Sequence, residues 1–247
     1  MNVLSGVTLL AADTARSRAY AQVLAHHGLQ PESVVLFGGA SGKPGQGQPS
    51  GVDALDGLFV PDFNESVEAT CQRWGWKLDH VPADSVNSPE VRAKLESLRP
   101  DLIIYSGFGG QIVKRDILTC SGPFLHLHPG WLPEFRGSTT VYYSWMMENN
   151  TGVSAILLEE QIDTGPIADR RRYPAPPVGV DVDYLYDPVI RADLLARVMQ
   201  KFVKRGGELR TEPQPSEGRN YYVIHPLLKH LILLRNDSAR QCSRSAA

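Results

Sequence analysis

The sequence predicts an α/β protein in which a mostly parallel sheet is flanked by helices and followed by a small C-terminal appendage. Compact apolar runs, each suited to a buried strand, alternate with segments of helical periodicity through the first half of the chain. This alternation stops near residue 179. At 247 residues the chain has the length of one ordinary domain or of one domain with an appendage. A chain of this size buries roughly 70% of its unfolded surface and needs no metal or disulfide to stay folded.

Apolar runs and capping residues predict the elements in order. Strands are expected over residues 7–13, 33–39, 77–82, 101–110 and 152–160, with a further short strand ending at LHLH. Helices are expected over residues 14–27, 65–76, 88–100, 138–150 and 188–204. Ser88 is the expected N-cap of the third helix, with Pro89 at its first helical position.

Three segments lack a periodic pattern. Residues 38–51, rich in Gly, Pro, Ser and Gln, are expected to form a mobile loop. Residues 162–177 are expected to lead out through a turn, and the arginine run 170–172 to lie on a solvated strand face. The final residues look like a loose tail. We therefore divide the chain into a main domain, a helix-and-strand extension and a disordered tail, over residues 1–178, 179–235 and 236–247.

Composition and charge exclude several classes of protein. The chain has 25 Lys and Arg against 27 Asp and Glu, a net charge of -2, and so lacks the basic surface of a nucleic-acid binder. Cys71, Cys120 and Cys242 are far apart and odd in number, which argues against a disulfide framework or a zinc cluster. No signal peptide is recognisable, and LLKHLILL is too short to span a bilayer. We expect a cytoplasmic protein that binds neither nucleic acid nor membranes.

The stretch LHLHPGWLPEFRG, residues 125–137, carries the clearest chemical signal. His126 and His128 lie two positions apart, so both side chains leave the same face of an extended strand. A metal site needs a third ligand, for which Asp163 is a candidate, but no cysteine or second histidine pair supports it. We therefore expect no metal. An acid/base pair and a packed strand end both stay open on these residues alone.

HPGWLPEFRG, followed by Asp163 in QIDTGPI, resembles the motifs of the formyltransferases that use 10-formyltetrahydrofolate. The resemblance covers roughly residues 100–172, and the general layout extends it to the N-terminus. It implies a Rossmann-like formyltransferase fold in which residues 1–178 are the catalytic domain. It also implies 10-formyltetrahydrofolate as co-substrate, and it allows a homodimer.

The resemblance assigns three catalytic roles. An amine attacks the formyl carbon and must lose a proton, and His128 matches the histidine that takes it. Asp163 matches the aspartate that orients this imidazole. His126 stands where the family has an asparagine that donates a hydrogen bond to the developing oxyanion. An imidazole N–H or an imidazolium can donate the same bond, so a working substitute, a weakened enzyme and a silent binding protein all stay open.

Two further groups of residues are expected to bind ligands. The folate is expected to contact Phe108, Gly109, Gly110, Gln111, Ile112, Gln161 and Ile162. The amine substrate is expected to contact Arg136, Gly137, Ser138 and Thr139. Arg136 has the planar fork that binds phosphate or carboxylate, although a structural salt bridge explains it equally well.

Features that the sequence lacks limit which amines can be the acceptor. No glycine-rich phosphate turn follows the first strand, which argues against a ribonucleotide acceptor. The C-terminal part has no strong positive excess, which argues against tRNA. The chain has no room for the extra domain of the folate deformylase. The expected acceptor is a small amine, an amino sugar or nucleotide-linked amino sugar. An amino-acid-type amine, folate deformylation and a catalytically silent binding protein are the alternatives.

Overall fold

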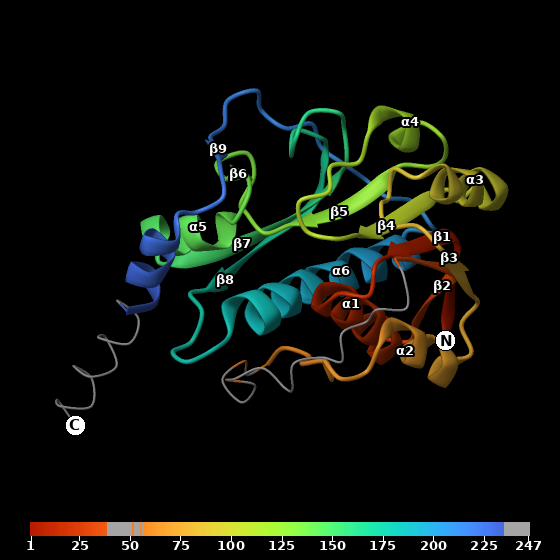
Figure 1. Cartoon of the computed structure of the whole chain (residues 1–247), viewed down its shortest axis with the longest axis horizontal. Coiled ribbons are helices and arrows are strands. Elements are labelled where there is room, and N and C mark those ends of the chain that lie inside the picture. Colours follow the sequence, from red (N-terminus) through yellow and green to blue (C-terminus); the bar gives the residue numbers. More distant parts are fainter. Residues whose placement is uncertain (39–50, 52–54, 56, 235–247) are drawn as a thin grey trace.

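The computed structural model describes residues 1–38, 51, 55 and 57–234. In this part of the chain, seven strands form one sheet in the order β3-β2-β1-β4-β5-β7-β8 (Figure 1). The strands are β1 (Asn2–Ala11), β2 (Leu29–Phe37), β3 (Leu78–Val81), β4 (Leu102–Ser106), β5 (Phe124–His128), β7 (Asn150–Leu157) and β8 (Ile167–Pro174). Pairing is parallel from β3 to β5, whereas β7 and β8 run antiparallel to their neighbours. The predicted mostly parallel α/β sheet is confirmed.

Helices cover both faces of this sheet (Figure 1). They are α1 (Ala15–His26), α2 (Val67–Trp74), α3 (Pro89–Leu98), α4 (Arg115–Leu118), α5 (Thr140–Glu148), the π-helical turn η2 (Val182–Tyr186) and α6 (Asp187–Lys204). One hydrophobic core lies between the sheet and α1, α2, α5 and α6, and another between the sheet and α3 and α4. Leu9 belongs to the first core and Leu10 to the second, as strand alternation requires. Among the described helices, none has the length and apolar content to cross a membrane.

Local capping signals in the sequence are realised in the structure. The side chains of Thr14, Ser66 and Ser88 each accept a backbone N–H in the first turn of α1, α2 and α3. Pro89 occupies the start of α3 as predicted. These caps satisfy N–H groups that a helix leaves unpaired at its first turn.

The edge strand β8 was predicted only in part. Of residues 167–174, which form β8, only the arginine run 170–172 was expected on a strand face, and the rest was expected within a turn. Arg170 and Arg172 stack over the ring of Trp131, at 4.8 and 4.5 Å from its centroid. Contact with an aromatic face lets a charged side chain occupy a half-buried strand position.

The helix expected in the C-terminal extension is part of the main body. Val189, Leu195 and Met199 of α6 are buried in the same core as β1 and α1. The predicted boundary at residue 178 therefore does not separate two cores. An amphipathic pattern shows that a helix has an apolar face, but not which sheet that face covers.

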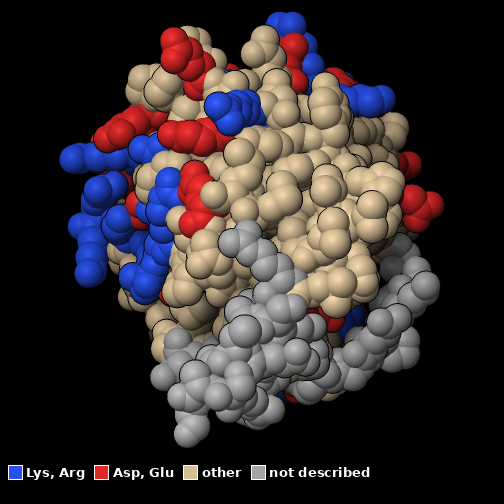
Figure 2. Space-filling model, turned by 90° about the vertical axis from the view of Figure 1, so that its left-hand side faces the viewer, with Lys and Arg blue, Asp and Glu red and all other residues tan. Residues whose placement is uncertain are grey.

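The chain after α6 returns to the segment that follows β5 (Figure 1). β9 (Asn220–Tyr221) pairs in parallel with β6 (Arg136–Gly137), and residues 226–234 are helical. Residues 222–234 expose apolar side chains, Tyr222, Leu227, Leu231 and Leu234 among them. Figure 2 faces the end of the molecule where this segment lies and shows a broad area without charged groups. Such a surface is typical of an interface, and the homodimer stays a prediction.

Two predicted segments cannot be compared with the structure. The expected loop over residues 38–51 lies outside the described residues, apart from Gly38 and Gly51. The expected tail over residues 236–247 also lies outside them.

Candidate active site

Three side chains meet at the carboxyl end of β5. His126 and His128 leave this strand on one face, and Asp163 comes from the segment between β7 and β8. A nitrogen of each histidine and a carboxylate oxygen of Asp163 lie within 4.8 Å of one another. His128 is 2% exposed and Asp163 is 8% exposed. The predicted catalytic trio therefore shares one buried site.

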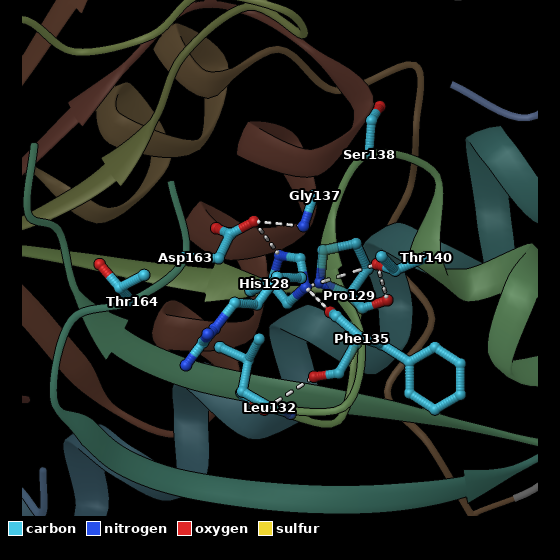
Figure 3. A network of polar contacts seen from close by, with 12 residues as sticks. His128, Pro129, Leu132, Phe135, Gly137, Ser138, Thr140, Asp163 and Thr164 are labelled. Atoms are coloured by element: carbon cyan, nitrogen blue, oxygen red, sulfur yellow. Dashed lines mark hydrogen bonds and ion pairs between the residues drawn. The ribbon is translucent and has the colours of Figure 1, made fainter. Parts of the chain in front are cut away.

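His128 is held between a carbonyl and a carboxylate (Figure 3). Its Nε2 lies 2.6 Å from the backbone oxygen of Phe135, and its Nδ1 lies 3.3 Å from Oδ2 of Asp163. A carbonyl oxygen can only accept a hydrogen bond, so Nε2 carries a proton. In the neutral imidazole the basic lone pair is then on Nδ1, and it faces the carboxylate.

Asp163 is fixed from both its side chain and its backbone. Oδ2 accepts the N–H of Gly137 at 2.8 Å, and the backbone oxygen accepts Nε2 of Gln214 at 3.0 Å. The residue has a φ of 56°, in the left-handed region that few non-glycine residues adopt. A strained backbone of this kind persists only when neighbouring contacts hold it.

The loop between β5 and β6 sets the position of the Phe135 carbonyl. The hydroxyl of Ser154 on β7 donates to the oxygen of Gly130 at 2.7 Å and accepts the N–H of Leu132 at 3.1 Å. A Cβ on Gly130 would lie 2.5 Å from the Phe135 oxygen and 2.6 Å from Nε2 of His128. Only glycine allows these two groups to meet there.

His126 stays neutral in this environment. Burial lowers its pKa well below the ordinary histidine value, and the positive charges of Arg191 and Arg16 lower it further. Arg191 is itself paired with Asp187 at 2.8 Å. Within the described part of the chain, the buried Nδ1 of His126 has no hydrogen-bond partner. Of the two forms that the sequence left open, the structure favours the imidazole over the imidazolium.

This lowered pKa predicts a loss of stability in mild acid. Below the unfolded histidine pKa of about 6.5, the unfolded chain binds a proton at residue 126 that the native chain does not. The free energy of unfolding should therefore fall as the pH drops below that value. His126→Asn should reduce the difference in melting temperature between about pH 7.5 and about pH 5.5. The exposed His230 supplies the control, His230→Asn, and an unchanged acid sensitivity in His126→Asn would contradict the assignment.

Most of the expected substrate-binding residues instead hold the C-terminal segment. The buried guanidinium of Arg136 donates to Gln214 Oε1 at 3.1 Å and to the backbone oxygen of Pro215 at 2.9 Å. The N–H of Ser138 donates to the oxygen of Tyr221 at 2.9 Å. Thr139 accepts the N–H of Ile224 through its hydroxyl at 2.8 Å. The guanidinium of Arg136 therefore holds the C-terminal segment, and its expected phosphate-binding role stays a prediction, while Gly137 reaches the site through its N–H.

Most of the expected folate-binding residues are exposed to solvent, whereas Gln111 is hydrogen-bonded within the fold. Ile112 and Ile162 are 59% and 55% exposed, and Phe108 is also exposed while its ring packs edge-on against Phe37. Gln111 is engaged within the fold, since its amide donates to the oxygen of Asp84 at 2.9 Å. Gln161 is exposed, and the turn around Gly109 and Gly110 leaves open space where a Cβ would be. An ion pair between Arg115 and Glu160, at 3.1 Å, joins the two segments that carry these residues.

Sequence reasoning missed three groups that shape the site. They are the backbone oxygen of Phe135, the amide of Gln214 and the guanidinium of Arg191. A backbone oxygen leaves no signature in the residue type. Gln214 and Arg191 lie in the part of the chain expected to be peripheral, and no local pattern links them to the site.

A family model described as formyl transferase matches residues 64–193, more than half of the chain. The chain belongs to the formyl transferase family. The match contains His126, His128 and Asp163, and the predicted family is confirmed.

Similarity to individual members of the formyl transferase family is partial. The chain is 29% identical over 136 residues to the methionyl-tRNA formyltransferase of Roseiflexus sp. (strain RS-1), covering 53% of this chain and 40% of that relative. A sugar N-formyltransferase from Shewanella sp FDAARGOS_354 superposes with a TM-score of 0.57 at 17% identity, covering 93% of this chain and 87% of that one. HypX from Aquifex aeolicus in complex with tetrahydrofolic acid gives a TM-score of 0.52 at 15% identity, covering 90% and 30%. The two structures show a likeness of fold.

Proposed function

We propose that this protein transfers a formyl group from 10-formyltetrahydrofolate to a small amine. The contact between Nδ1 of His128 and the Asp163 carboxylate, 3.3 Å apart in a buried site, carries this proposal. An imidazole beside a carboxylate can take a proton near neutral pH and then be stabilised as a cation. The formyl transferase family supports the reaction class.

In the proposed reaction the folate supplies the formyl group, and side chains of this protein handle the proton and the charge. Nδ1 of His128 accepts the proton that the amine loses, because Nε2 already donates to Phe135. Asp163 stabilises the resulting imidazolium. The Phe135 oxygen orients the ring, a role that the sequence had assigned to Asp163. His126, neutral and on the same strand face, donates its N–H toward the oxygen that becomes negative.

We propose that the pterin ring binds against the exposed apolar residues on the segments that follow β4 and precede Asp163. Phe108, Ile112 and Ile162 expose apolar side chains on the two segments joined by the Arg115–Glu160 ion pair. Backbone groups of Gly109 and Gly110 have no side chain in front of them. A pocket of apolar walls with a few backbone donors and acceptors is the common design for a planar ligand.

An amino sugar, free or nucleotide-linked, is the acceptor that we propose. The likeness of fold to a sugar N-formyltransferase over most of both chains supports it. A tRNA acceptor is the second candidate, because the curated relative with 29% identity is a methionyl-tRNA formyltransferase. The balanced charge of the chain favours the smaller acceptor.

The test is to mix the protein with 10-formyltetrahydrofolate and a panel of acceptors and to measure tetrahydrofolate release. The panel contains amino sugars, nucleotide-linked amino sugars, hydroxyornithine and methionyl-tRNA. Tetrahydrofolate release is expected with a free or nucleotide-linked amino sugar and with no other acceptor of the panel. Release without any acceptor would indicate deformylation, and folate binding without turnover would indicate a silent binding protein.

The variant His126→Asn restores the residue that the family resemblance places at this position. A marked loss of turnover would show that the imidazole is a working oxyanion donor. A large gain would show that His126 weakens the enzyme. Absence of turnover in both proteins, with every acceptor, would count against formyl transfer itself.

A further inference from the structure

We propose that His126, His128 and Asp163 also form a binding site for a divalent transition-metal ion of the zinc or iron class. Two imidazoles and one carboxylate on a common site are a ligand set that such ions use. The sequence argued against a metal because neither a cysteine nor a second histidine pair supports these three residues. The structure places the third ligand within 4.8 Å of the two histidines.

The contact between His128 and Asp163 calls for a cation. Nε2 of His128 donates to Phe135, so the neutral ring points a lone pair from Nδ1 at the carboxylate, 3.3 Å away. Two lone pairs at this distance repel each other unless a positive charge lies between them. Ligand atoms bound to a tetrahedral ion at about 2.0–2.1 Å lie about 3.3 Å apart. The two atoms already have the separation of a ligand pair.

The contacts behind these ligands are those that metal sites require. A metal-binding histidine usually donates its other N–H to a carbonyl or carboxylate, which fixes the tautomer and the ring. His128 does this with Phe135 at 2.6 Å. Asp163 accepts the N–H of Gly137 at 2.8 Å. Both ligand atoms are therefore aimed before an ion arrives.

His126 lies on the same face of β5, with its ligand atom within 4.8 Å of the other two, so its ring has to shift closer to reach the separation of about 3.3 Å between ligands of one tetrahedral ion. Its Nδ1 is buried and has no hydrogen-bond partner among the residues that the structure describes. Leaving a buried polar nitrogen unpaired costs about 1–3 kcal/mol. Coordination to an ion would satisfy an imidazole nitrogen that the fold leaves without a partner.

Nearby charges set the expected strength of the site. Asp163 supplies one negative charge, and the charge of Arg191 is offset by Asp187 at 2.8 Å. Arg16 donates to the Ser106 hydroxyl at 3.2 Å and to the Gly107 oxygen, and its positive charge is not offset by an ion pair within the described residues. Because the negative charge of Asp163 is opposed by the positive charge of Arg16, we expect the metal ion to bind with moderate rather than very high affinity.

Metal binding would exclude the reaction proposed above. This consequence rests on the proposed function: an ion on Nδ1 of His128 takes the lone pair that would accept the amine proton. Zinc should then inhibit formyl transfer, and a chelator should restore it. Binding itself is measured without folate or amine, so it can be tested whether or not formyl transfer is found.

The first experiment is a calorimetric titration of tag-free, chelator-treated protein with zinc. The wild-type chain should bind one ion, and His126→Asn and Asp163→Asn should each weaken binding by at least about 10-fold. His230→Asn, at an exposed histidine, is the matched control and should bind as the wild type does. Equal binding by wild type and His126→Asn would overturn the proposal.

A second measurement does not depend on the folding of any variant. Cobalt(II) added to the wild-type protein should produce visible absorption bands typical of nitrogen and oxygen coordination, and added zinc should remove them. A protonated Nδ1 of His128 that donates to Asp163 would remove the same repulsion without any metal ion. In that case no cobalt bands appear, and the metal site is refuted.

Discussion

Replacing His128 by alanine should lower kcat/KM for formyl transfer by about 10²-fold or more. Its Nδ1 carries the basic lone pair, which faces Asp163, and its Nε2 already donates to the Phe135 oxygen. Removal of the ring therefore leaves the amine proton without an acceptor at the site. Initial rates of tetrahydrofolate release, measured with the acceptor that supports turnover, provide the test.

Two further variants separate chemistry from folding. His230→Ala removes an exposed histidine and should leave both rate and melting temperature close to wild type. Asp163→Asn keeps an oxygen for the Gly137 N–H but removes the charge that stabilises the protonated ring. It should lower the rate and shift its pH profile. An unchanged rate in a folded His128→Ala protein would exclude this residue as the base.

Gly137→Ala should destabilise the protein and weaken the site together. Gly137 has a φ of 101°, and a Cβ there would lie 2.0 Å from the backbone oxygen of Tyr221. The φ alone costs about 1–3 kcal/mol for a residue with a side chain. The clash additionally forces β6 and β9 apart and moves the N–H that holds Asp163. Denaturant unfolding and hydrogen exchange at residues 220–221 would measure the two effects.

Gly179 provides the matched control for this substitution. Its φ is 79°, but a Cβ there would meet nothing within 4 Å. Gly179→Ala therefore carries the conformational cost without the clash. The destabilisation of Gly137→Ala beyond that of Gly179→Ala measures the contact with Tyr221. Equal destabilisation would show that β6 and β9 adjust freely.

Helix starts and buried strands were predictable because their causes are local. Thr14 and Ser88 cap helices through hydrogen bonds to N–H groups three residues away. β4 is recognisable because each of its residues, Leu102–Ser106, is buried between two cores. β8 was predicted only at its arginine run, because the contact of these arginines with Trp131, which lies in a different loop, is not local.

The candidate site was predictable to the extent that its residues are close in sequence or belong to a motif. His126 and His128 share a strand face by simple alternation, and the resemblance pointed to Asp163. The role of Arg136 was not predictable, since a guanidinium can bind a ligand or a neighbouring segment equally well. Its contacts with Gln214 and Pro215 depend on where the chain returns after α6.

Residue patterns along the chain were sufficient for the α/β class, the helix caps and the pair of histidines, because each depends on neighbours within a few positions. The direction of the His128 lone pair, the neutrality of His126 and the structural use of Arg136 required the folded protein. Each of these depends on a group from a distant part of the chain, namely the Phe135 oxygen, Arg191 and the segment that carries Gln214. Electrostatic and hydrogen-bond effects act through space over a few ångströms, and only folding brings such groups within that range.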